Sequence, residues 1–244
     1  NKNLAHNSGN NKVWLRYLND ANPNYQAIAL KQLSKNRAQG YDKLLLKQLK
    51  ESPHYSVRME ALQRVIYSGE EEITEALLFA LNDPYELIRR TAARFAGYCG
   101  HQSLIEPLVH TTLFSNESKR VQFAAQMSLP MFDFALVKAE IERQAQGTYI
   151  QDSIVKEVID YYERQNQRNI SSLALIRDSS APVERRVSAI RSLRNNNNHT
   201  QVDLLLEVLL DSNEDERVRI VLAEALGWFR WSICKEEIVK TLHA

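Results

Sequence analysis

Apolar residues recur along the chain at the spacing of helices that are buried on one side. One stripe lies within residues 57–67 and a second within residues 71–81, separated by a short polar stretch. The first stripe consists of Val57, Ala61, Leu62 and Val65, and the second of Ile73, Leu77, Leu78 and Leu81. Apolar positions three and four residues apart share one face of a helix. The pattern therefore predicts a pair of amphipathic helices, each of about 10–13 residues.

This helix-pair pattern repeats. Equivalent small or apolar positions are Ala29, Ala61, Ala92, Ala125, Ala189 and Leu222. Their spacings are 32, 31, 33, 64 and 33 residues, and 64 is twice 32, so a degenerate unit is expected around Glu157. A fixed period of this length is typical of helical repeats, which bury their apolar faces only by stacking.

The repeat predicts an α-solenoid of about seven antiparallel helix pairs in residues 20–244, preceded by a tail and a capping helix in residues 1–19. The units are expected to start near residues 20, 52, 83, 116, 148, 180 and 213. Each start carries a residue that can cap a helix: Asp20, Ser52, Asp83, Asn116, Thr148, Ser180 and Asn213. Turn formers are expected between the two helices of several units: Gly69, Gly100, Asp133 and Asn197.

Composition supports the all-α class. The 244 residues include only 7 Gly and 6 Pro, fewer than β-sandwiches or glycine-rich nucleotide-binding folds need for their turns. No apolar run approaches the roughly 18 residues of a membrane-spanning helix. Cys99 and Cys234 are too few for a disulfide scaffold and suit a reducing compartment, so we expect a cytoplasmic protein.

The repeated motif resembles the short HEAT repeat, including the HEAT-like repeats of bilin-lyase-type proteins. Three matches carry the resemblance: Val57-Arg58, Ile88-Arg89 and Val218-Arg219. The resemblance implies a right-handed superhelix whose second helices line a concave, partner-facing surface. It also implies that the motif arginines form a structural ladder, bridging to acids or carbonyls in adjacent turns. These are Arg58, Arg89, Arg186 and Arg219.

Charge is distributed unevenly along the chain. The formal net charge is +1, but residues 1–64 hold 11 Lys and Arg against 4 Asp and Glu. In the second helix of the first unit, Lys43, Lys47 and Lys50 share one face, and the next unit offers Glu71 and Glu75 in the corresponding place. A basic patch beside an acidic one favours binding to a protein over binding along the phosphates of a nucleic acid, which requires a continuous positively charged surface. Solvated surface charge is the alternative interpretation.

An aromatic cluster lies at the expected turn of the last unit. Trp228, Arg230 and Trp231 belong to residue types that are enriched in interface hot spots. The cluster is therefore a candidate for partner binding, with sealing of the end of the solenoid as the alternative.

No enzyme, metal or cofactor motif is visible. The six histidines form no His-Glu-x-x-His pattern, and phosphate-binding loops and nucleophile elbows are absent from the sequence. We expect no catalytic, metal-binding or cofactor-binding residues.

The sequence thus predicts a non-enzymatic scaffold or adaptor that binds another protein along its concave face. One alternative is nucleic-acid binding through the basic first third. Further arginines would contribute to it: Arg164, Arg168, Arg177, Arg185, Arg191 and Arg194. A second alternative, implied by the resemblance alone, is a lyase or chaperone for a protein-bound prosthetic group.

Overall fold

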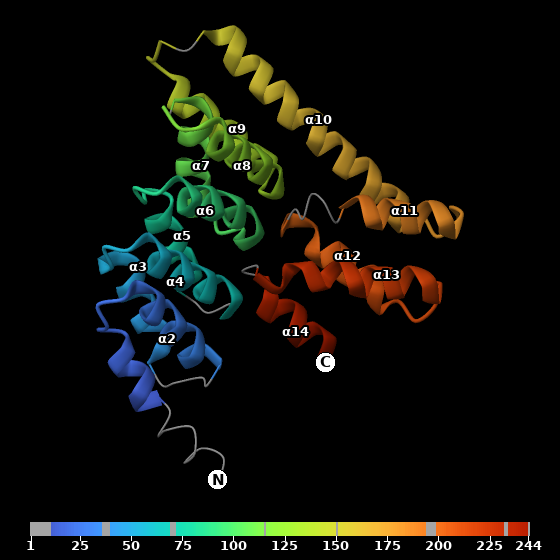
Figure 1. The fold of residues 1–244 in the computed structure, drawn as a ribbon. Helices are drawn as coiled ribbons and strands as arrows, with labels where there is room; N and C mark the ends of the chain where they lie inside the picture. The colour runs from blue at the N-terminus through green and yellow to red at the C-terminus, as the bar shows by residue number, and fades with distance from the viewer. Residues whose placement is uncertain are drawn as a thin grey trace. The chain divides into compact units, whose positions relative to one another are not determined.

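In the computed structural model, all regular secondary structure of the described residues is helical (Figure 1), which confirms the all-α class. The structure describes residues 11–35, 40–68, 72–114, 116–149, 151–193, 199–231 and 234–243. Within these ranges, no helix has both the length and the hydropathy to cross a membrane.

The chain divides into two compact units, residues 1–92 and residues 93–244. The boundary falls within α6 (Glu86–Cys99), where the sequence analysis did not predict one. The first unit contains a helical segment at residues 11–17, followed by α2 (Pro23–Lys35), α3 (Tyr41–Glu51), α4 (Tyr55–Ser68) and α5 (Ile73–Ala80). Within this unit, α4 packs against α2, α3 and α5.

In the described part of the second unit, eight α-helices follow α6. They are α7 (Ile105–Leu113), α8 (Lys119–Ser128), α9 (Phe134–Ala145), α10 (Asp152–Arg177), α11 (Val183–Leu193), α12 (Val202–Leu210), α13 (Glu216–Leu226) and α14 (Lys235–His243). Short 3-10 turns precede or follow several of them, including η2 (Leu129–Met131) and η5 (Gly227–Trp231). Here α10 packs against α9 and α11, and α13 packs against α11 and α12.

The first helices of the repeats start at regular intervals. Their first residues are Pro23, Tyr55, Glu86, Lys119, Asp152, Val183 and Glu216, which are 31 to 33 residues apart. All six aligned small or apolar positions are buried, whereas Glu157, at the equivalent place in the fifth unit, is exposed. A buried small residue lets neighbouring helices approach closely, and this recurs in both units.

The predicted capping residues lie too early to cap the helices directly. In the first unit, the side chains of Asp20, Ser52 and Asp83 each accept a hydrogen bond from the backbone N–H two residues later, in the turn that leads into the helix. In the second unit, Ser118 and Asp215 are the N-caps, each two residues after the predicted position. The prediction was wrong in register because Ser, Asp and Asn stabilise such turns as well as helix ends.

Two of the predicted turn residues lie where the chain changes direction. Gly100 follows the last residue of α6 with φ = 73°, a left-handed conformation that glycine adopts without steric penalty. Asp133 caps α9, accepting hydrogen bonds from the N–H groups of Ala135 and Leu136. The other two, Gly69 and Asn197, lie outside the described residues.

The fifth unit departs from the expected helix pair. One continuous helix of 26 residues, α10, occupies the place where two helices and a turn were expected (Figure 1). Residues 152–177 contain no Gly or Pro, so no residue in this stretch stops the helix. The interpretation of every unit as two helices is therefore wrong for this unit.

Candidate functional site

The arginine of the second repeat, Arg58, is buried between two loops. Its Nε and Nη2 atoms donate to the two carboxylate oxygens of Asp83 over 2.7 and 3.0 Å, and its Nη1 donates to the Ser52 carbonyl over 3.0 Å. The Asp83 side chain is fully buried. The hydrogen bonds between Arg58 and the Asp83 carboxylate raise the pKa of the Arg58 guanidinium above its usual value. The guanidinium is thus held charged, and the two-point contact fixes both side chains in place.

The equivalent arginines contact carbonyls at the end of the preceding helix or in the loop after it. Arg186 in α11 donates to the carbonyl of Ile176 in α10 and forms a buried ion pair with Glu214. Arg219 in α13 donates to the Leu209 carbonyl over 3.0 Å. In the first unit, Arg89 donates to the Asp83 carbonyl over 2.6 Å. Carbonyls at helix C-terminal ends have no partner within their own helix, and a cation there also offsets the helix dipole.

The sequence separation between the arginine and the carbonyl that it contacts differs between the two units. Arg58 and Arg89 contact the carbonyl six residues earlier, whereas Arg186 and Arg219 contact the carbonyl ten residues earlier. The bond therefore reaches the last turn of the preceding helix in the second unit and the loop after it in the first. Arg58, Arg186 and Arg219 each join two successive repeats, whereas the bond from Arg89 to the Asp83 carbonyl lies within one repeat.

Two of the charged candidates of the first unit pair with each other, and a third lies near an acid of its own helix. Lys50 of α3 forms an ion pair with Glu75 of α5, and Lys47 lies 3.9 Å from Glu51 on its own helix. Lys43 is exposed and forms no ion pair with a described residue. The patch therefore offers less free charge than its sequence suggests. Glu71 lies outside the described residues, as does Arg194 of the nucleic-acid alternative.

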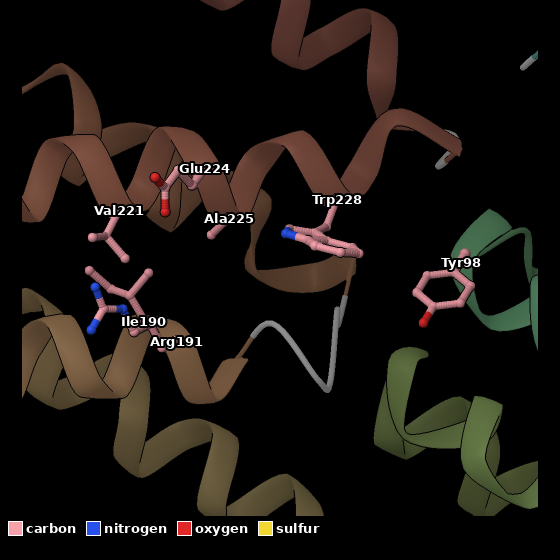
Figure 2. A pocket seen from close by; sticks show the side chains of 7 residues that line it. All are labelled: Tyr98, Ile190, Arg191, Val221, Glu224, Ala225 and Trp228. Atoms are coloured by element: carbon pink, nitrogen blue, oxygen red, sulfur yellow. The ribbon is translucent and has the colours of Figure 1, made fainter.

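Trp228, in contrast, lines a groove of the second unit with a volume of about 430 Å³ (Figure 2). The remaining lining residues are Tyr98, Ile190, Arg191, Val221, Glu224 and Ala225. They come from the end of α6, from α11 and from α13, and Trp228 lies in η5 directly after α13. The groove thus lies on first helices of their repeats, whereas sequence analysis directed attention to second helices. The side chains of Arg230 and Trp231 lie outside the described part of the chain.

The floor and the rim of the groove differ in polarity. Ile190 and Ala225 are buried, while Arg191 and Glu224 are exposed. Apolar floors with a few polar groups are characteristic of binding clefts. The groove can therefore hold apolar and charged atoms of a ligand together.

Tyr98 and Glu224 were not predicted as site residues from the sequence, and Arg191 was predicted only for nucleic-acid binding. A signal was available, because Tyr98 lies six residues after Ala92 and Trp228 lies six residues after Leu222. Equivalent repeat positions therefore supply both aromatic residues of the groove.

A second aromatic feature lies in the first unit. The rings of Tyr55 and Tyr85, at equivalent repeat positions, stack with centroids 4.1 Å apart and remain partly exposed. The stacked rings leave no space between them for a ligand. Among the described residues, no three His, Cys, Asp or Glu side chains are grouped so that they could hold a metal ion.

Comparisons with known proteins give no identification. No protein-family model matches the chain, and no curated protein matches it in sequence.

Proposed function

We propose that this chain is a non-enzymatic adaptor, a HEAT-like α-solenoid that binds another protein through the groove beside Trp228. The observation that carries the proposal is the groove itself. It combines two aromatic rings, an apolar floor and two exposed charges of opposite sign. Aromatic and Arg side chains dominate the binding energy of protein interfaces.

The solenoid part of the proposal rests on the regularity of the helices. First helices start every 31 to 33 residues, and arginines join successive repeats at three places. Repeats that contact mainly their neighbours form extended surfaces suited to holding a partner. Cys99 and Cys234 form no disulfide in the part of the chain that the structure describes, which is compatible with the cytoplasmic location that we propose with it.

The test is affinity capture of the full chain from its native cells, with and without nuclease, followed by mass spectrometry. We expect a stoichiometric partner protein that survives nuclease and is lost with Trp228→Ala. The matched control is Tyr149→Ala, because Tyr149 is an aromatic residue with 86% of its surface exposed. With the purified partner, removing a hot-spot tryptophan should raise Kd by about 30-fold, the equivalent of about 2 kcal/mol.

Other outcomes would contradict the proposal. Companions that disappear with nuclease would indicate nucleic-acid binding, and a co-purified coloured prosthetic group would indicate a lyase or chaperone. A partner that binds Trp228→Ala and the parent chain equally would exclude the groove as the docking site.

A further inference from the structure

Helix α8 of the second unit exposes a stripe of apolar and basic side chains. Arg120, Phe123 and Met127 are three and four residues apart, so they share one face of the helix. Phe123 has 63% of its surface exposed, more than any other described Phe, Leu, Ile, Val or Met, and Met127 has 44% exposed. The buried residues of α8 lie on the opposite face: Val121, Ala125 and Ser128. The stripe is therefore open surface and not part of the packing between helices.

The repeat itself does not require an apolar stripe at this place. Met127 lies two residues after the aligned position Ala125, and the equivalent residue is polar in every other repeat that has an aligned small or apolar residue. These equivalents are Lys31, Gln63, Arg94, Arg191 and Glu224. The position equivalent to Phe123 is also variable, with Arg90 in α6 and the exposed Ile220 in α13. Burial in the core therefore does not account for Phe123 and Met127.

The neighbouring helix adds a second arginine to this surface. Helices α6 and α8 are in contact, because the Ser128 hydroxyl lies 2.8 Å from the Ala93 carbonyl oxygen and 3.3 Å from that of Arg94. Arg94 is exposed and is equivalent to Met127 in the repeat. Arg94 therefore borders the stripe at Met127, whereas Arg120 borders it at Phe123.

The charge of this surface has a single sign. Residues 119–132 contain Lys119 and Arg120 but no Asp or Glu, and residues 93–105 contain Arg94 but no Asp or Glu. The whole chain, in contrast, has nearly equal numbers, with 31 Lys and Arg and 30 Asp and Glu. A guanidinium binds a carboxylate through two parallel hydrogen bonds. The partner that complements this surface is therefore acidic.

We propose that the α8 surface, formed by Arg94, Arg120, Phe123 and Met127, binds an acidic amphipathic helix of a partner protein. Aromatic residues, Met and Arg are the types enriched in protein interfaces. Apolar side chains of the partner helix cover Phe123 and Met127, and its Asp and Glu side chains pair with the two arginines. An amphipathic helix presents apolar residues three and four positions apart, which matches the stripe.

This surface goes beyond the proposed function, because it shares no residue with the groove beside Trp228. An adaptor with both would hold a partner at two separate places of its second unit. The two sites can be tested independently for the same reason.

The test is a selection from a displayed library of random peptides of about 16 residues, roughly four helical turns, with the full chain immobilised. The parent chain should enrich peptides that combine Asp or Glu with apolar residues three or four positions apart. The double variant Phe123→Ala/Met127→Ala should bind these peptides about tenfold more weakly. The double variant Arg94→Glu/Arg120→Glu should select basic peptides in their place. Circular dichroism checks that every variant is folded.

The matched controls make the same kinds of change elsewhere in the second unit. Ile220→Ala removes a side chain that is 51% exposed at the position equivalent to Phe123. Arg185→Glu reverses an exposed charge of α11, and Trp228→Ala alters the groove. All three variants should bind the selected peptides as tightly as the parent chain does.

Four results would overturn the inference. If no selected peptide depends on Phe123 and Met127, the α8 surface is not a docking site, and if the dependent peptides are uncharged or basic, the arginines do not select the partner. If the peptides are lost with Trp228→Ala, they occupy the groove. In these three cases the capture experiment still decides the adaptor function separately. If the parent chain self-associates and Phe123→Ala/Met127→Ala does not, the occupant is a second copy of this chain.

Discussion

At the scale of single residues, buried guanidinium–carboxylate pairs connect successive repeats. Arg58 donates two hydrogen bonds to Asp83, whose side chain is fully inaccessible to solvent. Removing the guanidinium leaves that carboxylate buried and uncompensated. We therefore expect Arg58→Ala to lower the free energy of unfolding by about 3–5 kcal/mol, measured by urea denaturation at neutral pH.

The control for this prediction is an exposed pair on a single helix of the same unit. Lys47 and Glu51 are 3.9 Å apart, and about two thirds of each side chain is exposed. Lys47→Ala should change stability by about 0.5 kcal/mol or less. If both substitutions lowered the free energy of unfolding by similar amounts, burial of the Arg58–Asp83 pair would not increase its contribution to stability.

A second residue-scale prediction concerns Glu140 in α9. Hydrogen bonds from Arg143 and, to a smaller extent, from Gln144 lower the pKa of Glu140 below its usual value of 4.5, although burial opposes them. A carboxyl group with a lower pKa in the folded state contributes stability that is fully present above the unfolded pKa. That contribution is lost as the pH falls through the folded pKa.

Glu140→Gln should therefore reduce the urea midpoint at pH 7 relative to the parent chain, and the difference should shrink as the pH falls through the lowered pKa of folded Glu140. The measurement is a series of urea titrations from neutral to acidic pH. Parallel profiles for the two proteins would contradict the assigned role of Arg143.

At the scale of helices, two glycines at equivalent repeat positions differ in the space around them. A Cβ atom on Gly97 in α6 would lie 2.7 Å from Sδ of Met131 and 3.0 Å from the backbone of Ser128. A Cβ atom on Gly227 would meet nothing within 4 Å. Ser128 also donates a hydrogen bond to the Ala93 carbonyl over 2.8 Å, so α6 and α8 cannot separate freely.

Gly97→Ala should consequently destabilise the protein by about 1–3 kcal/mol because it overpacks this contact. Gly227→Ala should be neutral or stabilising by up to about 1 kcal/mol, because alanine loses less backbone entropy on folding. Thermal unfolding followed by circular dichroism checks both. An equal response of the two variants would contradict the close approach of α6 and α8.

The helices also show how far a sequence pattern can be used. Periodicity and the scarcity of Gly and Pro predicted the all-α class, because the 3.6-residue period is a local property of each helix. The long α10 was not predicted as one helix, since its apolar positions fit a degenerate repeat as well as a continuous helix. The buried residues of α10 are Tyr162, Asn169 and Ile176, which are seven residues apart. Which positions of the helix are buried is determined by the helices that pack against it.

At the scale of the whole molecule, the candidate site was harder to predict than the helices. Trp228 was identified from residue type, but Tyr98 is 130 positions earlier in the sequence, and no local pattern joins them. Conversely, Lys50 and Glu75 were predicted from the sequence to bind a partner, but in the structure they form an ion pair with each other. Contacts between distant residues depend on how helices pack, which periodicity does not determine.

The presence of two compact units leads to a prediction about cooperativity. Leu62 in α4 and Leu222 in α13 are both fully buried, one in each unit. In a repeat protein, stability is approximately a sum of local terms and interfaces between neighbours. A cavity at either leucine should therefore weaken its own unit first, by about 2–5 kcal/mol.

Hydrogen exchange read by mass spectrometry measures this directly, because amide protection reports local and global opening separately. Leu62→Ala should reduce the protection of α3 and α4 while the amides of α11 to α13 keep theirs. Leu222→Ala should produce the reverse pattern. If either substitution lowers protection evenly in both units, the chain unfolds as a single cooperative body, and the proposed solenoid with independent repeats would have to be abandoned.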